Sequence, residues 1–311
     1  VDQDDFDLVD KLAALYDEPY ADSSAMPTYR VCELARKHVT VALSGDGADE
    51  LFAGYGRYRW HMNEEKVRQV LPLNLRKAVF KPLGKLYPKM DWAPRFLRAK
   101  TTFQSMAMDT VEGYHNSISI LRQDERSKLF SKSYKQKLNG YTSLNVFRKY
   151  QNKVKTLDPM KTAQYLDMKT YLVGDILTKV DRASMAHSLE VRVPFLDHKF
   201  VEWGFQVPSE INLEQGVGKK SLKRAMEPHL PHDVLYRKKM GFSIPVAQWF
   251  RGPLKEKLYN GLLSKQMEDC GYFDMAQLRK LIDQHVKGIK DNSAPLWTLM
   301  MFESFMRQNL S

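Results

Sequence analysis

Several kinds of sequence feature are scarce or missing in this chain, and each absence excludes a class of protein. Only two cysteines, Cys32 and Cys270, occur in 311 residues, and they match no metal-ligand spacing. We therefore expect reduced thiols in a cytoplasmic protein rather than a disulfide framework. No stretch approaches the roughly 18 consecutive apolar residues of a membrane span, and no charged, apolar, small-residue signal opens the chain. We expect no membrane partner.

Acidic residues are outnumbered, with 37 Asp and Glu against 48 Lys and Arg, for a formal charge of +11. The basic residues cluster at 76–100 and 132–155, mixed with Tyr and Phe, as they are in some nucleic-acid-binding proteins. Because these clusters lie on amphipathic, helix-like segments, a solvated face is the favoured interpretation. A basic helical nucleic-acid-binding or interaction module remains an alternative. The apolar content of 43% is ample for a core of one or two domains.

The most informative stretch runs from Val39 to Tyr58. Val39–Leu43 has the length and β-branched content of a buried strand. It ends at the sequence SGDG, residues 44–47, after which apolar residues recur at helical spacing. The glycines are thus predicted to lie in a tight turn between a strand and a helix N-terminus. α/β proteins bind nucleotides at such turns, because free backbone N–H groups and the helix dipole point at the ligand.

Three acidic residues lie in or just after this turn: Asp46, Asp49 and Glu50. Their charges would repel a bare phosphate, so we expect Mg²⁺ to lie between carboxylate and phosphate. The alternative is that Asp46 caps the helix, with Asp49 completing a variant of the capping box. Two other phosphate-binding patterns fail: the turn does not read GxGxxG, and GVGKKS at 216–221 lacks the first glycine of a Walker A loop.

Three blocks of the chain resemble the synthetase half of the glutamine-hydrolysing asparagine synthetases, a family of ATP pyrophosphatases. They are SGDGADELFAGY at 44–55, VDRASMAHSLEVRVPFLD at 180–197 and YRKKMGF at 236–242. The resemblance implies an α/β fold of the adenine nucleotide alpha-hydrolase (PP-loop ATPase) type, here mostly helical with one or two strands. Residues 59–158 carry no motif that we can assign.

The resemblance also implies roles for individual residues. Ser44, Gly45, Gly47 and Arg182 would contact ATP. Asp49 and Glu50 would hold Mg²⁺, and Asp46 would position, or accept a proton from, the attacking ammonia. Lys239 would neutralise charge developing on the phosphates, which suits a compact ammonium on a mobile stem. From the residues alone, the charged side chains of 181–197 could equally form ion pairs that tie a helix to an extended segment.

The implied reaction is amidation of aspartate to asparagine through β-aspartyl-AMP. The acid substrate would lie near the polar loop of Asp22, Ser23 and Ser24, although the same residues could simply cap a helix. Family members have Glu where this chain has Asp46, so another carboxylate, such as a sugar acid, is an alternative acceptor.

The chain starts without Met and contains neither the family's SGGxDS loop nor its glutaminase domain. We therefore expect residues 1–311 to form one truncated synthetase domain that is inactive alone. A glutaminase domain of the same longer chain would supply ammonia, and a homodimer is compatible with the sequence.

Apolar spacing predicts helices elsewhere. One is closed by Pro19, one covers the stripe Tyr165, Met168, Leu172, Ile176 and Val180, one begins within 216–224, and two or three fill 252–311 with a turn at 288–293. Four prolines, at 72, 82, 88 and 94, are expected to divide the middle of the chain into short helices.

Overall fold

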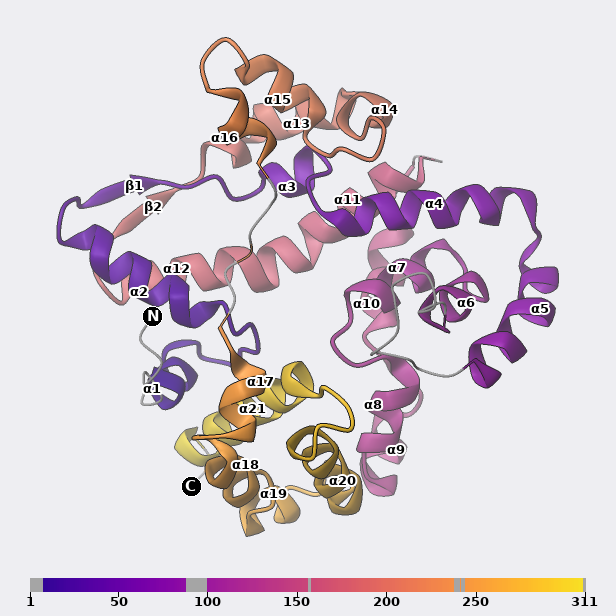
Figure 1. The fold of residues 1–311 in the computed structure, drawn as a ribbon, viewed down its shortest axis with the longest axis vertical. Helices are drawn as coiled ribbons and strands as arrows, with labels where there is room; N and C mark the ends of the chain where they lie inside the picture. Colours follow the sequence, from indigo (N-terminus) through magenta and orange to yellow (C-terminus); the bar gives the residue numbers. More distant parts are fainter. Residues whose placement is uncertain (1–7, 88–99, 156–157, 238–240, 242–243, 310–311) are drawn as a thin grey trace.

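The computed structural model describes residues 8–87, 100–155, 158–237, 241 and 244–309. Helices dominate these ranges, and the strands described form one sheet of two (Figure 1). The mostly helical character expected from the sequence is confirmed. Within the described ranges, no helix combines the length and the apolar content that crossing a bilayer would need.

The elements follow one another along the chain, with some helices only one turn long. The first half contains α1 (Leu8–Leu15), α2 (Ala25–Arg36), β1 (Val41–Leu43), α3 (Ala48–Leu51), α4 (Gly56–Val70), α5 (Leu73–Leu86), α6 (Lys100–Met106), α7 (Thr110–Ile118), α8 (Gln123–Leu129), α9 (Lys132–Leu138) and α10 (Leu144–Gln151). The second half contains α11 (Pro159–Lys169), α12 (Thr178–Met185), β2 (Glu190–Arg192), α13 (His198–Gln206), α14 (Ser209–Asn212), α15 (Lys220–Met226), α16 (His232–Tyr236), α17 (Val246–Arg251), α18 (Lys255–Leu262), α19 (Lys265–Asp269), α20 (Met275–Val286) and α21 (Ser293–Asn309).

The sheet pairs β1 with β2 in parallel, with Ala42 opposite Val191. These two side chains pack against the largest apolar cluster, whereas Val41 and Leu43 on the alternate face are 40% and 73% exposed. The prediction of a buried strand was therefore wrong in its burial. Apolar β-branched residues indicate a strand, but they do not show which face another layer covers. The pairing brings the glycine turn beside residues 190–192, as Ser44 N–H donates to Arg192 O at 2.8 Å.

The apolar core consists of three clusters. The largest joins α1 and α2 to the C-terminal helices α17–α21, with Trp297 at its centre. A second packs α4, α7, α10 and α11 together around Tyr58 and Tyr114. The third is small and holds Leu51 and Phe52 of α3 against residues of α13 and α15. Helix α3, which follows the glycine turn, is therefore packed from the side that the predicted site does not use.

The helix predicted around residues 161–180 is present but interrupted. Helix α11 ends at Lys169, a π-helical turn spans Leu172–Leu177, and α12 follows. Of the predicted apolar stripe only Leu172 is buried, while Gln164, Asp167 and Lys179 lie inside. The interruption rotates the buried face. π-Turns of this kind are frequent at functional sites.

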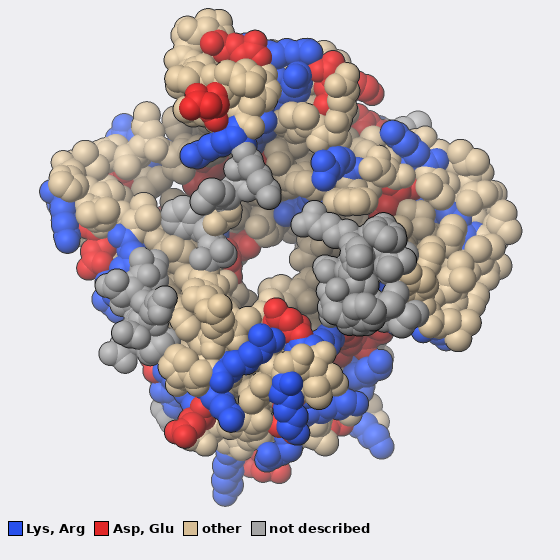
Figure 2. Space-filling model, viewed as in Figure 1, with Lys and Arg blue, Asp and Glu red and all other residues tan. Residues whose placement is uncertain are grey.

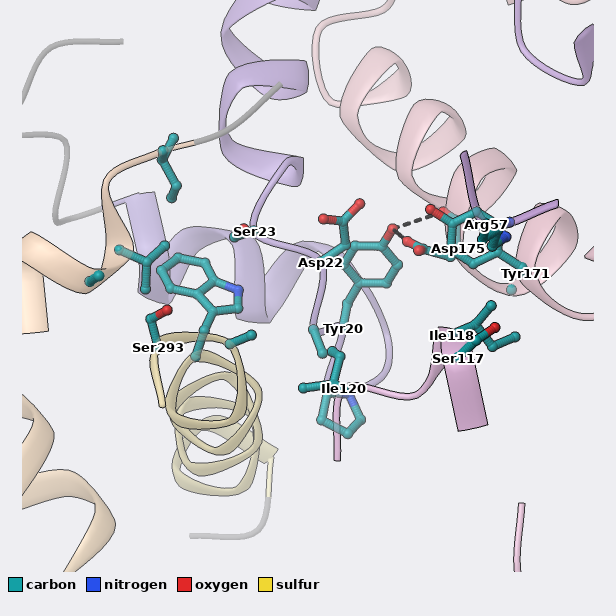
Figure 3. Close-up of a pocket in the computed structure, with 18 of the residues that line it drawn as sticks. Tyr20, Asp22, Ser23, Arg57, Ser117, Ile118, Ile120, Tyr171, Asp175 and Ser293 are labelled. Carbon is teal, nitrogen blue, oxygen red and sulfur yellow. Dashed lines mark hydrogen bonds between the residues drawn. The ribbon is translucent and has the colours of Figure 1, made fainter. Parts of the chain in front are cut away.

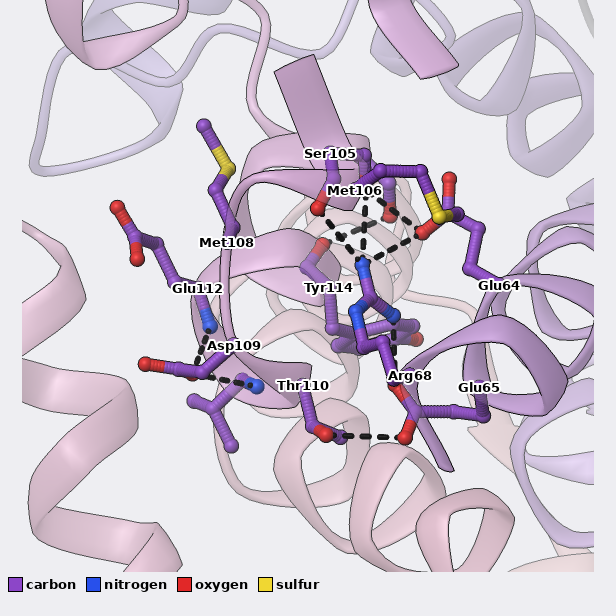
Figure 4. Close-up of polar contacts among 12 residues, drawn as sticks. Glu64, Glu65, Arg68, Ser105, Met106, Met108, Asp109, Thr110, Glu112 and Tyr114 are labelled. Atoms are coloured by element: carbon purple, nitrogen blue, oxygen red, sulfur yellow. Dashed lines mark hydrogen bonds and ion pairs between the residues drawn. The ribbon is translucent and has the colours of Figure 1, made fainter. Parts of the chain in front are cut away.

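Buried arginines account for part of the basic middle region (Figure 4). Arg68 of α4 is 8% exposed and contacts Glu65 at 2.5 Å and Glu64 at 2.9 Å. Its Nη2 also donates to the carbonyl and hydroxyl oxygens of Ser105, both at 3.0 Å. The buried Arg76 similarly donates to Met106 O at 2.6 Å. These cations join α4, α5 and α6, so they are not available to an external polyanion.

Lys and Arg on the face shown in Figure 2 are spread over several elements, with Asp and Glu among them. They do not join into one basic stripe on that face, which favours the solvated-face interpretation. The prediction that Pro82 ends a helix was wrong: it lies inside α5. Pro82 is exposed, and proline has no N–H to donate to the carbonyl one turn earlier in the helix. Water can hydrogen-bond to that carbonyl instead. Pro88 and Pro94 lie outside the described residues.

The other helical predictions have mixed outcomes. Helix α1 confirms the first, although it ends at Leu15, before Pro19. Helix α15 begins at Lys220, within the predicted range. Four helices, α18 to α21, replace the two or three expected after residue 252, and α20 and α21 are separated by the predicted turn.

The turn between β1 and α3 depends on one glycine. Gly47 precedes α3 with a φ of +84°, in the left-handed region, and a Cβ added there would lie 2.3 Å from Leu196 Cδ2. Gly45 is different, because a Cβ at that position would have no neighbour within 4 Å. Position 45 thus has room for a side chain, whereas position 47 requires glycine because its backbone is left-handed.

Gly47→Ala should therefore destabilise the fold by about 1–3 kcal/mol, through left-handed backbone strain and contact with Leu196. Gly45→Ala is the matched control and should change stability by less than about 1 kcal/mol. Urea unfolding of both variants measures the difference. Equal losses would show that the turn does not have the described geometry.

Candidate functional site

The glycine turn forms a compact polar loop. Ser44 Oγ donates to Asp46 Oδ2 at 2.5 Å, which holds the half-buried carboxylate against the turn. Helix α3 begins after Gly47 without a side-chain cap, so the alternative in which Asp46 caps the helix is wrong. Because α3 has only one turn, its dipole is small, and the turn needs positive charge from elsewhere to hold an anion.

Lys219 supplies that charge. Its Nζ lies 3.1 Å from Asp49 Oδ2, and both side chains are about three-quarters shielded from solvent. The backbone of Lys219 is anchored by its own N–H, which donates to Phe52 O at 2.8 Å. Two glycines allow this approach: a Cβ at Gly54 would lie 2.1 Å from Asp49, and one at Gly218 would lie 2.2 Å from Ala53 O. The GVGKKS stretch is therefore not a Walker A loop, yet it brings a lysine to the predicted site.

Glu50 lies in a different environment from Asp49. It is 1% exposed, and Tyr55 Oη donates to its Oε1 at 2.7 Å. Burial raises the pKa of Glu50, and the hydrogen bond from Tyr55 only partly opposes that rise. The side chain of Gln164 donates to Glu50 O at 2.7 Å and to Leu51 O at 2.9 Å. These contacts attach α3 to α11.

The structure does not bring all predicted residues together by direct contact. Arg182 is half exposed and pairs with Asp17 at 3.2 Å and with Asp181 at 3.6 Å. Glu190 and Arg192 pair with each other on the exposed sheet at 2.7 Å, and Asp197 caps α13. Ion pairs are thus present in 181–197, but those described do not join α12 to β2. Lys239 lies outside the described residues.

A magnesium site would have to use few protein ligands. Among the described residues, no three His, Cys, Asp or Glu side chains gather closely enough to enclose a metal. Mg²⁺ that bridges to phosphate needs only one or two carboxylates, with water and phosphate oxygens for the rest. The carboxylate of Asp49 could supply one such ligand: its side chain is 22% exposed, and a metal would take the place that Lys219 Nζ occupies 3.1 Å away.

A large cavity lies beyond Tyr55. Its volume is about 940 Å³, which is in the range of small-molecule sites. The walls come from residues 18–23, 55–57, 117, 118, 120, 171, 174, 175, 244–247, 293, 294 and 297. The space-filling view shows the molecule hollowed near its centre (Figure 2). The polar loop of Asp22 and Ser23, predicted to lie near an acid substrate, forms part of the wall.

The alternative that this polar loop caps a helix is not borne out at the start of α2. Ser24 precedes α2 but gives it no side-chain cap. Instead, Ser24 Oγ donates to Asp22 Oδ2 at 2.5 Å, and Lys179 Nζ donates to the same carboxylate oxygen at 2.6 Å. Burial alone would raise the pKa of Asp22, but Lys179 and Ser24 lower it below its usual value. Asp22 is thus kept ionised at the cavity.

Asp175, in the π-helical turn, faces the same cavity (Figure 3). The hydroxyl of Tyr20 donates to its carboxylate and, at 2.8 Å, to its backbone carbonyl. Burial, followed by the negative charge of Asp22, raises the pKa of Asp175 to about 6. One wall of the cavity therefore carries two carboxylates of different basicity.

A guanidinium lies elsewhere in the wall. Arg57 is held by the fully buried Asp167, with Nη2 at 2.7 Å from Oδ2, and the ring of Tyr55 lies 3.8 Å from its central carbon. Sequence analysis missed Arg57, Asp167, Asp175, Lys179 and Lys219. The i,i+4 spacing of Asp175 and Lys179 is a signal that could have drawn attention to both residues, although the lysine pairs with Asp22. For Arg57 and Asp167 the sequence offered no signal.

The fold and the site together define a class: a mostly helical α/β chain with an acidic glycine turn between strand and helix, next to a polar cavity. Comparison with known proteins places it more closely. The sequence model of the asparagine synthase family matches residues 1–307, and the chain belongs to this family.

Curated relatives agree with this assignment. Asparagine synthetase [glutamine-hydrolyzing] 1 of Bacillus subtilis is 32% identical over 292 residues, covering 94% of this chain and 44% of the relative. A putative asparagine synthetase [glutamine-hydrolyzing] of Mycobacterium bovis is 34% identical over 293 residues, covering 92% and 42%. Amidase chry2 of Gibberella zeae is 25% identical over 288 residues, covering 85% and 41%. The chain thus spans less than half the length of these relatives.

Asp175→Asn should alter the dependence of stability on pH. Because the pKa of Asp175 is raised from 3.8 to about 6, the folded chain holds this proton more tightly than the unfolded chain does. The stability that this group contributes is therefore present below about pH 4 and is lost as the pH rises through about 6. The variant should lack this loss of about 1–2 kcal/mol, allowing for partial exposure.

Urea unfolding at about pH 4.5 and pH 7.5 gives the measurement. The exposed Asp269, which lies at the end of α19, provides the control variant Asp269→Asn, with the pH dependence of the wild type. If Asp175→Asn lost as much stability as the wild type over this range, Asp175 would not be the titrating group.

Proposed function

We propose that the protein containing this chain is an ATP-dependent amide ligase that converts aspartate to asparagine. The β-carboxylate oxygen of aspartate attacks the α-phosphorus of ATP, and pyrophosphate leaves. Ammonia then attacks the carbonyl carbon of β-aspartyl-AMP, the bond from that carbon to the AMP oxygen breaks, and the nitrogen loses a proton. The family assignment and the names of the relatives support this reaction.

The main observation behind the proposal is that a glycine with open space around it, Gly45, and an ion pair, Asp49 and Lys219, occur at the same turn. Gly45 has free space where a Cβ would be, so a phosphate can approach the backbone closely. Asp49 and Lys219 lie at the start of α3 as an ion pair that is partly accessible. Such a pair can separate when a ligand brings a metal cation for the carboxylate and phosphate oxygens for the ammonium.

In this proposal the residues around the turn have separate roles. Ser44 and the backbone of Gly45 and Gly47 bind ATP. Asp46, oriented by its bond from Ser44, accepts the proton that the nucleophilic nitrogen loses. Asp49 holds Mg²⁺, which neutralises phosphate charge when it is bound.

The roles of three further residues, Glu50, Arg182 and Lys239, remain predictions. Glu50 is a predicted second ligand, although here it is buried against Tyr55. Arg182 would have to leave Asp17 to reach a phosphate. Lys239 is the predicted phosphate cation, and the chain after it enters the cavity wall at Ile244. Lys219 joins this set as an additional cation.

A second acceptor class deserves a test, because two relatives carry other names. Amidase chry2 of Gibberella zeae and amidase chyE of Penicillium rubens are 25% and 24% identical to this chain. Family membership alone therefore does not determine the acid. Pyrophosphate release by the full-length protein, measured with aspartate and with sugar acids, separates the two possibilities. Release with a sugar acid but not with aspartate would overturn the proposed acceptor.

The ammonia would come from a glutaminase domain of the same longer chain.

Asp46→Asn should lower asparagine formation from ammonia by about 10²–10⁴-fold, because the isosteric amide cannot accept the proton. Aspartate-dependent exchange of pyrophosphate into ATP should persist, since that half-reaction precedes ammonia attack. Asp49→Asn should instead raise the Mg²⁺ concentration required for exchange. Both assays use the full-length protein, with Asp269→Asn as control. Unchanged asparagine formation in Asp46→Asn would remove the proposed role of Asp46.

A further inference from the structure

One edge of the Arg57 guanidinium is fixed by a buried carboxylate. Its Nη2 and Nε lie 2.7 Å and 3.3 Å from Asp167 Oδ2. The hydroxyls of Tyr58 and Tyr114 donate to the same oxygen, each at 2.5 Å. Asp167 is fully buried, so its carboxylate requires this set of donors. One edge of the guanidinium is thus fixed by groups from α4, α7 and α11.

Two tyrosine rings also lie close to the guanidinium. The rings of Tyr55 and Tyr171 have their centres 3.8 Å and 4.5 Å from the central carbon of Arg57. The Arg57 side chain is 19% exposed, and it lines the cavity. Arg57 donates to Tyr114 and Asp167 through Nε and Nη2, and its Nη1 carries two further N–H groups. The Arg57 side chain also hydrogen-bonds to Tyr171, so the guanidinium is held in place at the cavity and is preorganised for an anion.

The other charged groups of the cavity are acidic. Asp22 is bonded by Lys179 and Ser24, and Asp175 is bonded by Tyr20. Figure 3 shows the Asp22 carboxylate beside the Tyr20 ring, with the Tyr20 hydroxyl turned towards Asp175. Glu18 adds an exposed acid at the wall. The carboxylates would repel a ligand that carries only a negative charge. A ligand with a negative and a positive group close together would suit the cavity, because Arg57 can bind the first and the carboxylates the second.

We propose that this cavity binds the head group of a free α-amino acid, with Arg57 binding the α-carboxylate and Asp22 and Asp175 binding the α-ammonium. Asp167 is a positioning residue that acts through Arg57. As a statement about the acceptor, the inference rests on the proposed amide ligase function. It adds what selects aspartate over a sugar acid: a sugar acid has no ammonium group for the two carboxylates.

Two small acids test the two halves of the site separately. β-Alanine keeps the reacting carboxylate and the amine of aspartate but lacks its α-carboxylate. Succinate keeps both carboxylates but lacks the amine. For the full-length wild type, with ammonia as nitrogen source, kcat/KM from pyrophosphate release should favour L-aspartate over each by at least about tenfold, since a hydrogen bond to a charged group contributes about 1.5–3 kcal/mol.

Removing Arg57 alone would leave the buried Asp167 unpaired, so the main variant is the double substitution Arg57→Gln with Asp167→Asn. It should reduce the preference for L-aspartate over β-alanine by about 10–100-fold, mainly through KM for aspartate, and leave β-alanine unchanged. A purely structural role would lower both substrates equally. Arg57→Lys, which keeps a cation beside Asp167, should reduce the same preference if the double variant fails to fold.

Asp175→Asn should reduce the preference for L-aspartate over succinate by at least about tenfold and leave the preference over β-alanine unchanged. Asp269→Asn is the matched control and should change neither ratio. If either variant left its own ratio at the wild-type value, the assignment of that half of the site would be overturned.

Calorimetric titration of the full-length protein with L-aspartate, β-alanine and succinate, without ATP, separates this inference from the proposed function. Selective binding of L-aspartate that both variants abolish, without pyrophosphate release by any acid, would support the site and refute the ligase. Aspartate-dependent pyrophosphate release with unchanged selectivity in the variants would support the ligase and refute the site.

Discussion

The carboxylate of Asp167 must be neutralised, and much of the structure around the cavity depends on how this is done. It is fully buried on α11, where an ionised group without donors would be very unfavourable. The donors come from Arg57, Tyr58 and Tyr114, so one interaction fixes α4 and α7 against α11. Gln164 on the same helix donates to the backbone of α3. One helix thus positions both the cavity wall and the acidic turn.

The acidic turn and the cavity are connected through Tyr55. Its hydroxyl donates to Glu50 on α3, while its ring lies over Arg57 in the cavity wall. A nucleotide at the turn and an acid in the cavity would therefore lie on two sides of one tyrosine. The one-turn helix α3 provides little dipole, and Lys219 compensates by bringing a full charge.

Family membership and acceptor choice depend on different parts of this chain. The motifs at 44–55 and 180–197 form the glycine turn, helix α3, most of α12 and strand β2, and they carry the family resemblance. The cavity wall contains Arg57, Tyr171 and Asp175, which come from separate segments. Under the proposed assignment, substitutions in that wall would change the acid without altering the motifs. This arrangement agrees with the range of names among the relatives.

The local features could be predicted from the sequence: the strand, the glycine turn, the acids beside it and several of the helices, because each depends on neighbouring residues. It could not determine that Leu43 is exposed, since burial depends on a covering layer. It also could not place Lys179 on Asp22 or Arg57 on Asp167, which lie 157 and 110 positions apart. Those pairs form only in the folded chain, in which α12 packs beside α2 and α11 packs against α4. Tertiary packing alone therefore decided the cavity and the charges that line it.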